Sequence, residues 1–98
     1  MTIDEFVATL AQSKPPAGLN PILAGLWHDA KGNWAAAHEI AQGGEGTKGF
    51  DRLHAYLHRK EGDTGNARYW YRRAGAQVFE GSLEQEWNEL VLANGIEK

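Results

Sequence analysis

The chain has 98 residues, of which 42% are hydrophobic and 23% charged, and its formal net charge is −3. This composition is typical of one globular domain, and the negative charge argues against general nucleic-acid binding, whose affinity comes mainly from positive charge. The lack of cysteine excludes disulfide scaffolds and thiolate chemistry. The apolar runs are too short to span a membrane, and Asp4 and Glu5 stand where an export signal would be basic, so we expect a soluble cytoplasmic protein.

Six segments combine a helix-start signal with apolar residues at helical spacing. Thr2 with Glu5 and Ser82 with Gln85 have the form of capping boxes, in which each side chain bonds the other residue's backbone N–H. No segment alternates apolar and polar residues as a strand would. The sequence therefore predicts an all-α chain of about six helices, over residues 2–14, 20–32, 33–42, 50–61, 63–75 and 82–94.

The chain also contains an internal repeat with a period of thirty residues. Residues 26–37 return as residues 56–67: His28 matches His58, Gly32 matches Gly62 and Ala37 matches Ala67, and Asn33 is matched by the similar Asp63. A fixed period of this size is typical of stacked helical hairpins. We expect two such hairpins, at about 20–42 and 50–75, with the first and last helices as caps over their exposed ends.

These residues resemble the tetratricopeptide-type repeat and its Sel-type relative. That family places small residues where the two helices of a hairpin cross, and Gly25 with Ala37 and Ala55 with Ala67 fit those places. Residues 66–74 are similar to the Sel-type second helix, whereas Pro21, Asp51 and Ala41 depart from the usual pattern. Residues 26–30 (Leu-Trp-His-Asp-Ala) and 69–74 (Tyr-Trp-Tyr-Arg-Arg-Ala) also resemble segments of a set of small bacterial proteins. The resemblance implies a single domain, 1–98, built as a right-handed stack of antiparallel hairpins.

Such stacks present a groove to a peptide or helix of a partner. Residues 48–73 carry a net charge of +4 while the rest of the chain carries −7, so the two parts could pair within the fold or offer a basic face to an acidic partner. We therefore expect a non-enzymatic protein–protein interaction or scaffolding module, monomeric or homodimeric and without a cofactor. The candidate partner-binding or anion-binding residues are Arg59, Arg68, Tyr69, Arg72 and Trp27.

The histidines support an alternative function. His54 and His58 are four residues apart on one predicted helix, so both rings can point the same way, as in half of a zinc site. A third ligand could come from His28, Asp29 or Glu61 if the hairpins stack closely. The alternative is therefore a small metal-binding protein or enzyme that uses His28, His54 and His58. The opposing interpretation is that His28 and His58 are hydrogen-bonded packing residues of their hairpins.

Overall fold

The computed structural model describes all 98 residues as an all-α chain of six helices. The helices are α1 (Ile3–Ala8, continued by a short 3₁₀ turn at Thr9–Ala11), α2 (Pro21–Ala30), α3 (Trp34–Gly43), α4 (Lys48–Lys60), α5 (Thr64–Arg73) and α6 (Leu83–Ala93). The molecule measures 34 × 24 × 22 Å. None of its helices has the length and apolar character needed to cross a bilayer.

Side-chain caps begin most of these helices. Both predicted capping boxes are confirmed, at Thr2 and at Ser82. The side chains of Asn20, Asn33 and Asp63 each accept a hydrogen bond from the backbone N–H three residues later, which begins α2, α3 and α5. Each such cap contributes about 1 kcal/mol. Helix α4 begins without a side-chain cap.

Two bounds differ from the sequence prediction. The first helix ends at Ala11 rather than at residue 14, because Gln12 already has an extended backbone ahead of Pro15 and Pro16. Helix α4 begins at Lys48, two residues earlier than expected, because the glycine-rich segment before it forms a tight turn in which the side chain of Asp51 accepts a hydrogen bond from the N–H of Gly46.

The two predicted hairpin turns are confirmed and are alike. Gly32 has φ of +84° and Gly62 has φ of +86°, a left-handed conformation that glycine adopts without strain. In each turn the N–H of the next residue reaches back to a histidine carbonyl, from Asn33 to His28 and from Asp63 to His58, both at 2.9 Å. These bonds end α2 and α4 and allow α3 and α5 to run back antiparallel.

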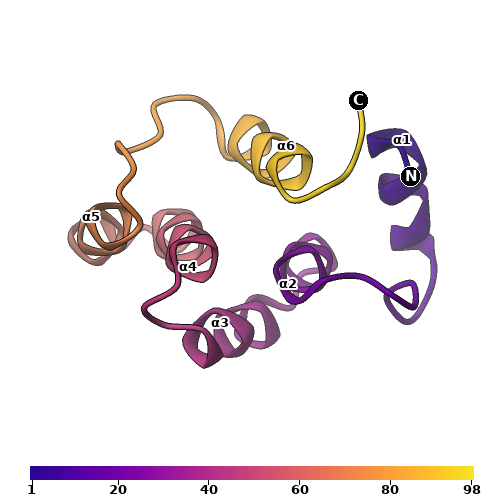
Figure 1. Cartoon of the computed structure of the whole chain (residues 1–98), viewed down its shortest axis with the longest axis horizontal. Helices are drawn as coiled ribbons and strands as arrows, with labels where there is room; N and C mark the ends of the chain where they lie inside the picture. The colour runs from indigo at the N-terminus through magenta and orange to yellow at the C-terminus, as the bar shows by residue number, and fades with distance from the viewer.

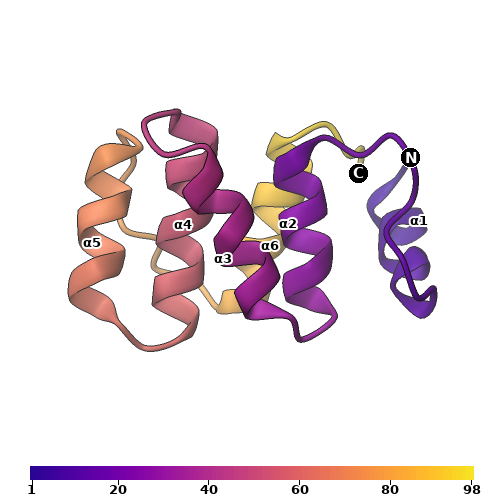
Figure 2. The same cartoon turned by 90° about the horizontal axis from the view of Figure 1, so that it is seen from below.

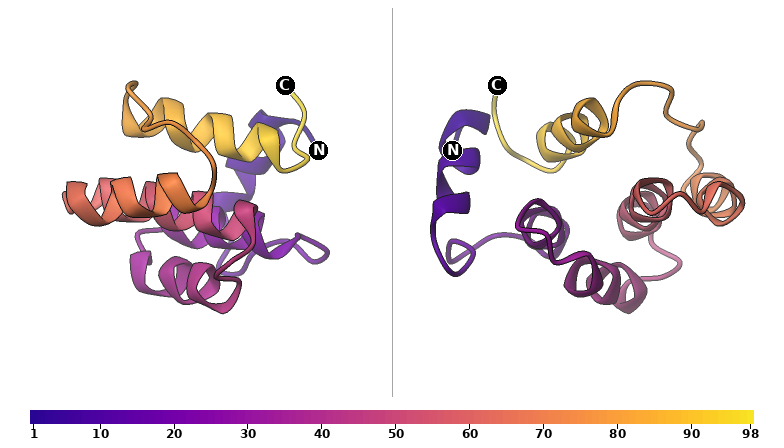
Figure 3. Two further views of the ribbon diagram at one scale, coloured as in Figure 1. Left: turned by 60° about the vertical axis from the view of Figure 1, so that its left-hand side comes forward. Right: turned by 180° about the vertical axis from the view of Figure 1, so that it is seen from behind.

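Helices α2 to α5 follow one another in an arc, each packed against the next, and α6 returns across the inner side of that arc (Figure 1). Helix α4 is central, since it packs against α2, α3, α5 and α6, and α1 packs on α6 at the opposite end of the molecule from α5 (Figures 1 and 2). The two ends of the chain meet, as Figure 3 shows, and the N–H of Ile3 donates to the carbonyl of Glu97 at 2.7 Å.

The main core lies between α6 and the inner sides of α2 and α4. Its largest fully buried apolar side chains are Phe6, Leu26, Trp27, Leu53, Tyr56 and Leu57. A polar network fixes α6 in this place: the Glu86 carboxylate is 0% exposed and receives Arg52 at 2.6 Å, Arg59 at 2.8 Å and the hydroxyl of Tyr71. Breaking a buried ion pair of this kind costs about 3–5 kcal/mol, so α6 is firmly held on the inner face.

Candidate metal site

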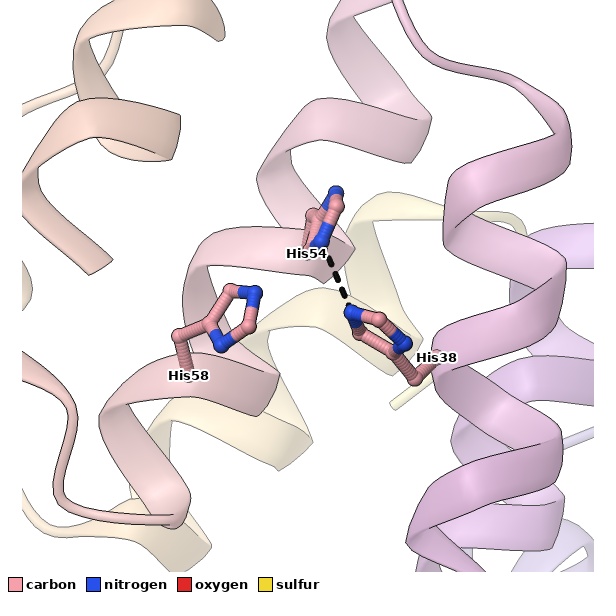
Figure 4. Close-up of side chains that lie close together, drawn as sticks. All are labelled: His38, His54 and His58. Atoms are coloured by element: carbon pink, nitrogen blue, oxygen red, sulfur yellow. Dashed lines mark hydrogen bonds between the residues drawn. The ribbon is translucent and has the colours of Figure 1, made fainter. Parts of the chain in front are cut away.

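Three histidine rings converge between α3 and α4. His38 comes from α3, and His54 and His58 lie one turn apart on α4 (Figure 4). One ring nitrogen from each lies within 4.8 Å of the others, and the Nε2 atoms of His38 and His54 form a hydrogen bond at 3.0 Å (Figure 4). His58 also turns a nitrogen toward the other two rings (Figure 4).

Neighbouring side chains hold the three rings in place. Trp34 stacks on His38 with ring centroids 4.6 Å apart, and its Nε1 donates to the carbonyl of Leu57 at 2.8 Å. Trp70 of α5 stacks on His54 at 3.9 Å. The Nδ1 of His58 contacts the carboxylate of Glu61 at 2.7 Å. Because this bond occupies Nδ1, the nitrogen that His58 turns toward the cluster is Nε2.

The surroundings favour neutral imidazoles. Burial, and then the proximity of His58 and His38, lowers the pKa of His54 to about 4. Burial and the proximity of His58 also lower the pKa of His38 below its ordinary value. His54 and His58 are buried and His38 is half-buried, so charging these rings would cost solvation and bring like charges together. Neutral imidazole is the form that binds metal ions.

The arrangement has the elements of a transition-metal site. Three imidazole nitrogens suit zinc and its neighbours in the first transition series. The Glu61 carboxylate on His58 is the outer partner that metal-bound histidines usually have, where it fixes the tautomer and the ring orientation. The Nδ1 of His54 is buried and has no hydrogen-bond partner, which costs free energy of folding.

The structure brings together two of the three histidines named from the sequence and replaces the third. His54 and His58 belong to the cluster, but His28 does not: it lies in the last turn of α2, half-buried, with its ring against Trp27. Sequence reasoning missed His38. One signal was present, since two antiparallel helices joined by a short turn place residues at equal distances from the turn side by side, and His38 and His54 are each about eight residues from its middle.

The five residues proposed for a partner surface lie in different environments. Trp27 is 1% exposed in the core and donates from Nε1 to Thr9 at 3.1 Å. Arg59 is half-buried and bonds Glu86 and the carbonyl of Gly81. The remaining three, Arg68, Tyr69 and Arg72, are exposed together on α5.

Comparison with models of protein families, with curated protein sequences and with solved structures finds no match for this chain.

Proposed function

We propose that the protein binds a divalent transition-metal ion, with zinc as the first choice, through His38, His54 and His58. The observation that carries the proposal is the convergence of three ring nitrogens within 4.8 Å from two different helices. Zinc bonds imidazole nitrogen at 2.0–2.1 Å, so the nitrogens of a tetrahedral site lie about 3.3 Å apart. The separation of the His38 and His54 nitrogens, 3.0 Å, is close to that value, and small ring movements would bring the third nitrogen into range.

The ligand set also limits the choice of metal. The chain has no cysteine, so soft thiolate coordination is excluded. Calcium and magnesium prefer oxygen ligands, and the nearest carboxylate, that of Glu61, is bonded to His58. Three imidazoles leave a fourth position for water or for another ligand.

A bound ion would link the two hairpins. His38 lies on the second helix of the first hairpin, and His54 and His58 lie on the first helix of the second hairpin. The ion would tie these helices together across the turn that follows Gly43. Metal binding would then stabilise the fold, because the unfolded chain lacks the assembled site.

Equilibrium titration of chelator-stripped protein with zinc, against a competing chromophoric chelator, tests the proposal. Wild type is expected to bind one ion. His38→Gln is expected to lose more than about a hundredfold in zinc affinity. Loss of a hydrogen-bond partner of a metal ligand lowers affinity about ten- to hundredfold, and loss of the ligand itself should lower it further. His28→Gln is the matched control, since it removes a half-buried histidine outside the cluster and should bind as wild type does. Equal affinities for all three proteins would contradict the proposal.

We also propose that α2–α3 and α4–α5 are two units of a tetratricopeptide-like stack. The two hairpin turns support this, because they share the same glycine conformation and the same backbone bonds. The position of Gly25 supports it as well, since a Cβ there would lie 3.6 Å from the side chain of Ile40 and 3.9 Å from the backbone oxygen of Ala37, both on α3. Helix α6 lies on the inner side of the arc, where such a stack would receive a partner, so a partner would bind the outer side instead.

The charges favour a second candidate function, binding of an acidic protein partner by the outer face of α5. Among the basic residues of 48–73, Arg52, Arg59 and Lys60 are ion-paired with buried carboxylates. The remaining arginines, Arg68, Arg72 and Arg73, are exposed and have no ion pair, and Tyr69 and Val78 add exposed apolar surface at 43% and 46%.

Fluorescence anisotropy with a labelled glutamate-rich peptide tests this candidate. The expected result is binding that weakens as salt is raised and that is lost in Arg68→Ala/Arg72→Ala. Binding that the double variant leaves unchanged would contradict it. Helix α5 lies at the end of the molecule, so these substitutions should leave zinc binding intact.

A further inference from the structure

Helix α4 has a second constellation of polar side chains on the face opposite the histidines. Tyr56 and Lys60 each follow a histidine of the cluster by two residues, which places them about 200° around the helix. They line a cavity of about 380 Å³ between α1, α2, α4 and α6. This volume lies within the range of small-molecule sites.

The walls of this cavity are largely apolar. The apolar residues are Val7, Leu10, Ala30, Leu83 and Trp87. Glu84 and Asn88 also line the cavity, and Asp29, Tyr56 and Lys60 form a bonded polar group, as in pockets that orient a small ligand with an apolar body.

Asp29 is one of the residues that line the cavity, and its carboxylate is buried. It is 2% exposed and accepts hydrogen bonds from the hydroxyl of Tyr56 at 2.7 Å and from the Nζ of Lys60 at 2.9 Å. A carboxylate offers about four acceptor positions, so these two bonds leave room for another donor. Burial and the bond to Asp29 raise the pKa of Tyr56, so the phenol keeps its proton and remains a donor to that carboxylate.

The lysine is the movable member of this group. Lys60 is the last residue of α4, and its side chain is 37% exposed, whereas that of Asp29 is 1% exposed. The ammonium group can therefore turn out into water on its flexible stem, but the carboxylate cannot leave. A buried carboxylate without a partner is costly, so another cation must take the place of the lysine when it moves.

The charges around the cavity identify the ligand class. Asp29 and Glu84 are acidic and Lys60 is basic, so the lining carries a net charge of −1. We propose that this cavity binds a small organic monocation: an ammonium group that bonds Asp29 in place of Lys60, carried on an apolar or aromatic body that packs against Trp87 and Leu83. The site is independent of the histidine cluster, because it uses the other face of α4.

A purely structural role predicts different behaviour. If Asp29, Tyr56 and Lys60 only link α2 to α4, removal of the lysine leaves the carboxylate without its cation and does not increase the affinity for an amine. If the lysine holds the place of a ligand, its removal takes away a competitor. Lys60→Met therefore separates the two roles, and in this variant the hydroxyl of Tyr56 still donates to the Asp29 carboxylate.

The experiment is an NMR titration of the ¹⁵N-labelled protein with three probes that share one aromatic body: 2-phenylethylamine, 2-phenylethanol and phenylacetate. The indole N–H of Trp87, which donates to the carbonyl of Leu26 at 3.0 Å, reports on the cavity wall. The amine is expected to bind at least about tenfold more tightly than the alcohol, because its bond to the carboxylate is charge-assisted.

Three variants complete the test. Lys60→Met should tighten amine binding by about tenfold, because the lysine no longer competes with the amine for the charge-assisted bond to Asp29. Asp29→Asn should abolish the preference for the amine over the alcohol. Ala30→Phe should weaken all probes by narrowing the cavity while it leaves the carboxylate in place, so it remains informative if Asp29→Asn fails to fold. A preference for phenylacetate, no binding of the amine, or weaker amine binding by Lys60→Met would overturn the proposal.

Discussion

Zinc is expected to raise the melting temperature of wild-type protein, and the size of the rise follows from the position of the site. The ligands His38 and His54 are sixteen residues apart and come together only in the folded chain. An ion that binds the folded state alone, at a free concentration one hundred times its dissociation constant, adds about 2.7 kcal/mol to the free energy of unfolding. For a domain of this size each kcal/mol raises the melting temperature by roughly 4–8 °C, so the expected shift is roughly 11–22 °C.

Circular dichroism melts of chelator-stripped protein, recorded with and without zinc, measure this shift. His38→Gln should lose it, and His28→Gln should keep it, whatever the two substitutions do to the metal-free protein. The reasoning would be refuted by an equal rise in all three proteins, or by no rise in wild type at a zinc concentration that saturates binding.

Three further results are expected. Glu61→Gln should lower zinc affinity by about ten- to hundredfold in a chelator competition, since it weakens the bond that orients His58; unchanged affinity would remove Glu61 from the site. Gly25→Ala should lower the free energy of unfolding in urea by about 1–3 kcal/mol, because its Cβ would lie 2.8 Å from Leu53, whereas Gly43→Ala has open space and should not destabilise. Metal-free protein should lose stability as the pH falls from about 6.5 toward about 4, the depressed pKa of His54, because between these values the unfolded chain binds the proton that the folded chain rejects. A flat stability profile over that range would contradict this explanation.

The local features of the fold were predictable because they depend on neighbours in sequence. The caps at Thr2 and Ser82 and the turns at Gly32 and Gly62 each require only four to six consecutive residues. Their spacing then predicted six helices and the pairing of α2 with α3 and of α4 with α5.

Features that depend on distant residues were not predicted. Nothing local to Glu86 indicates that it lies buried between Arg52 and Arg59, because an acidic residue in an amphipathic helix is usually exposed. This network holds α6 across the inner side of the arc, where Glu86 engages Arg59.

The candidate site could be predicted only in part, because one of its three histidines comes from a different helix. The spacing of His54 and His58 within one helix shows that their rings share a face. The third ring depends on how α3 packs on α4, and the internal repeat directed attention to His28 because it matches His58 in the alignment of the two units. The ring of His28 lies against Trp27, whereas the ring of His38 lies against that of His54 where α3 packs on α4.

X-ray absorption at the zinc edge tests the central claim most directly. The protein loaded with one equivalent of zinc is expected to show a four-coordinate ion with imidazole nitrogens at 2.0–2.1 Å, and His38→Gln should lose one of them. A shell made only of oxygen atoms, or an identical spectrum from His38→Gln, would show that the three histidines do not hold a metal ion.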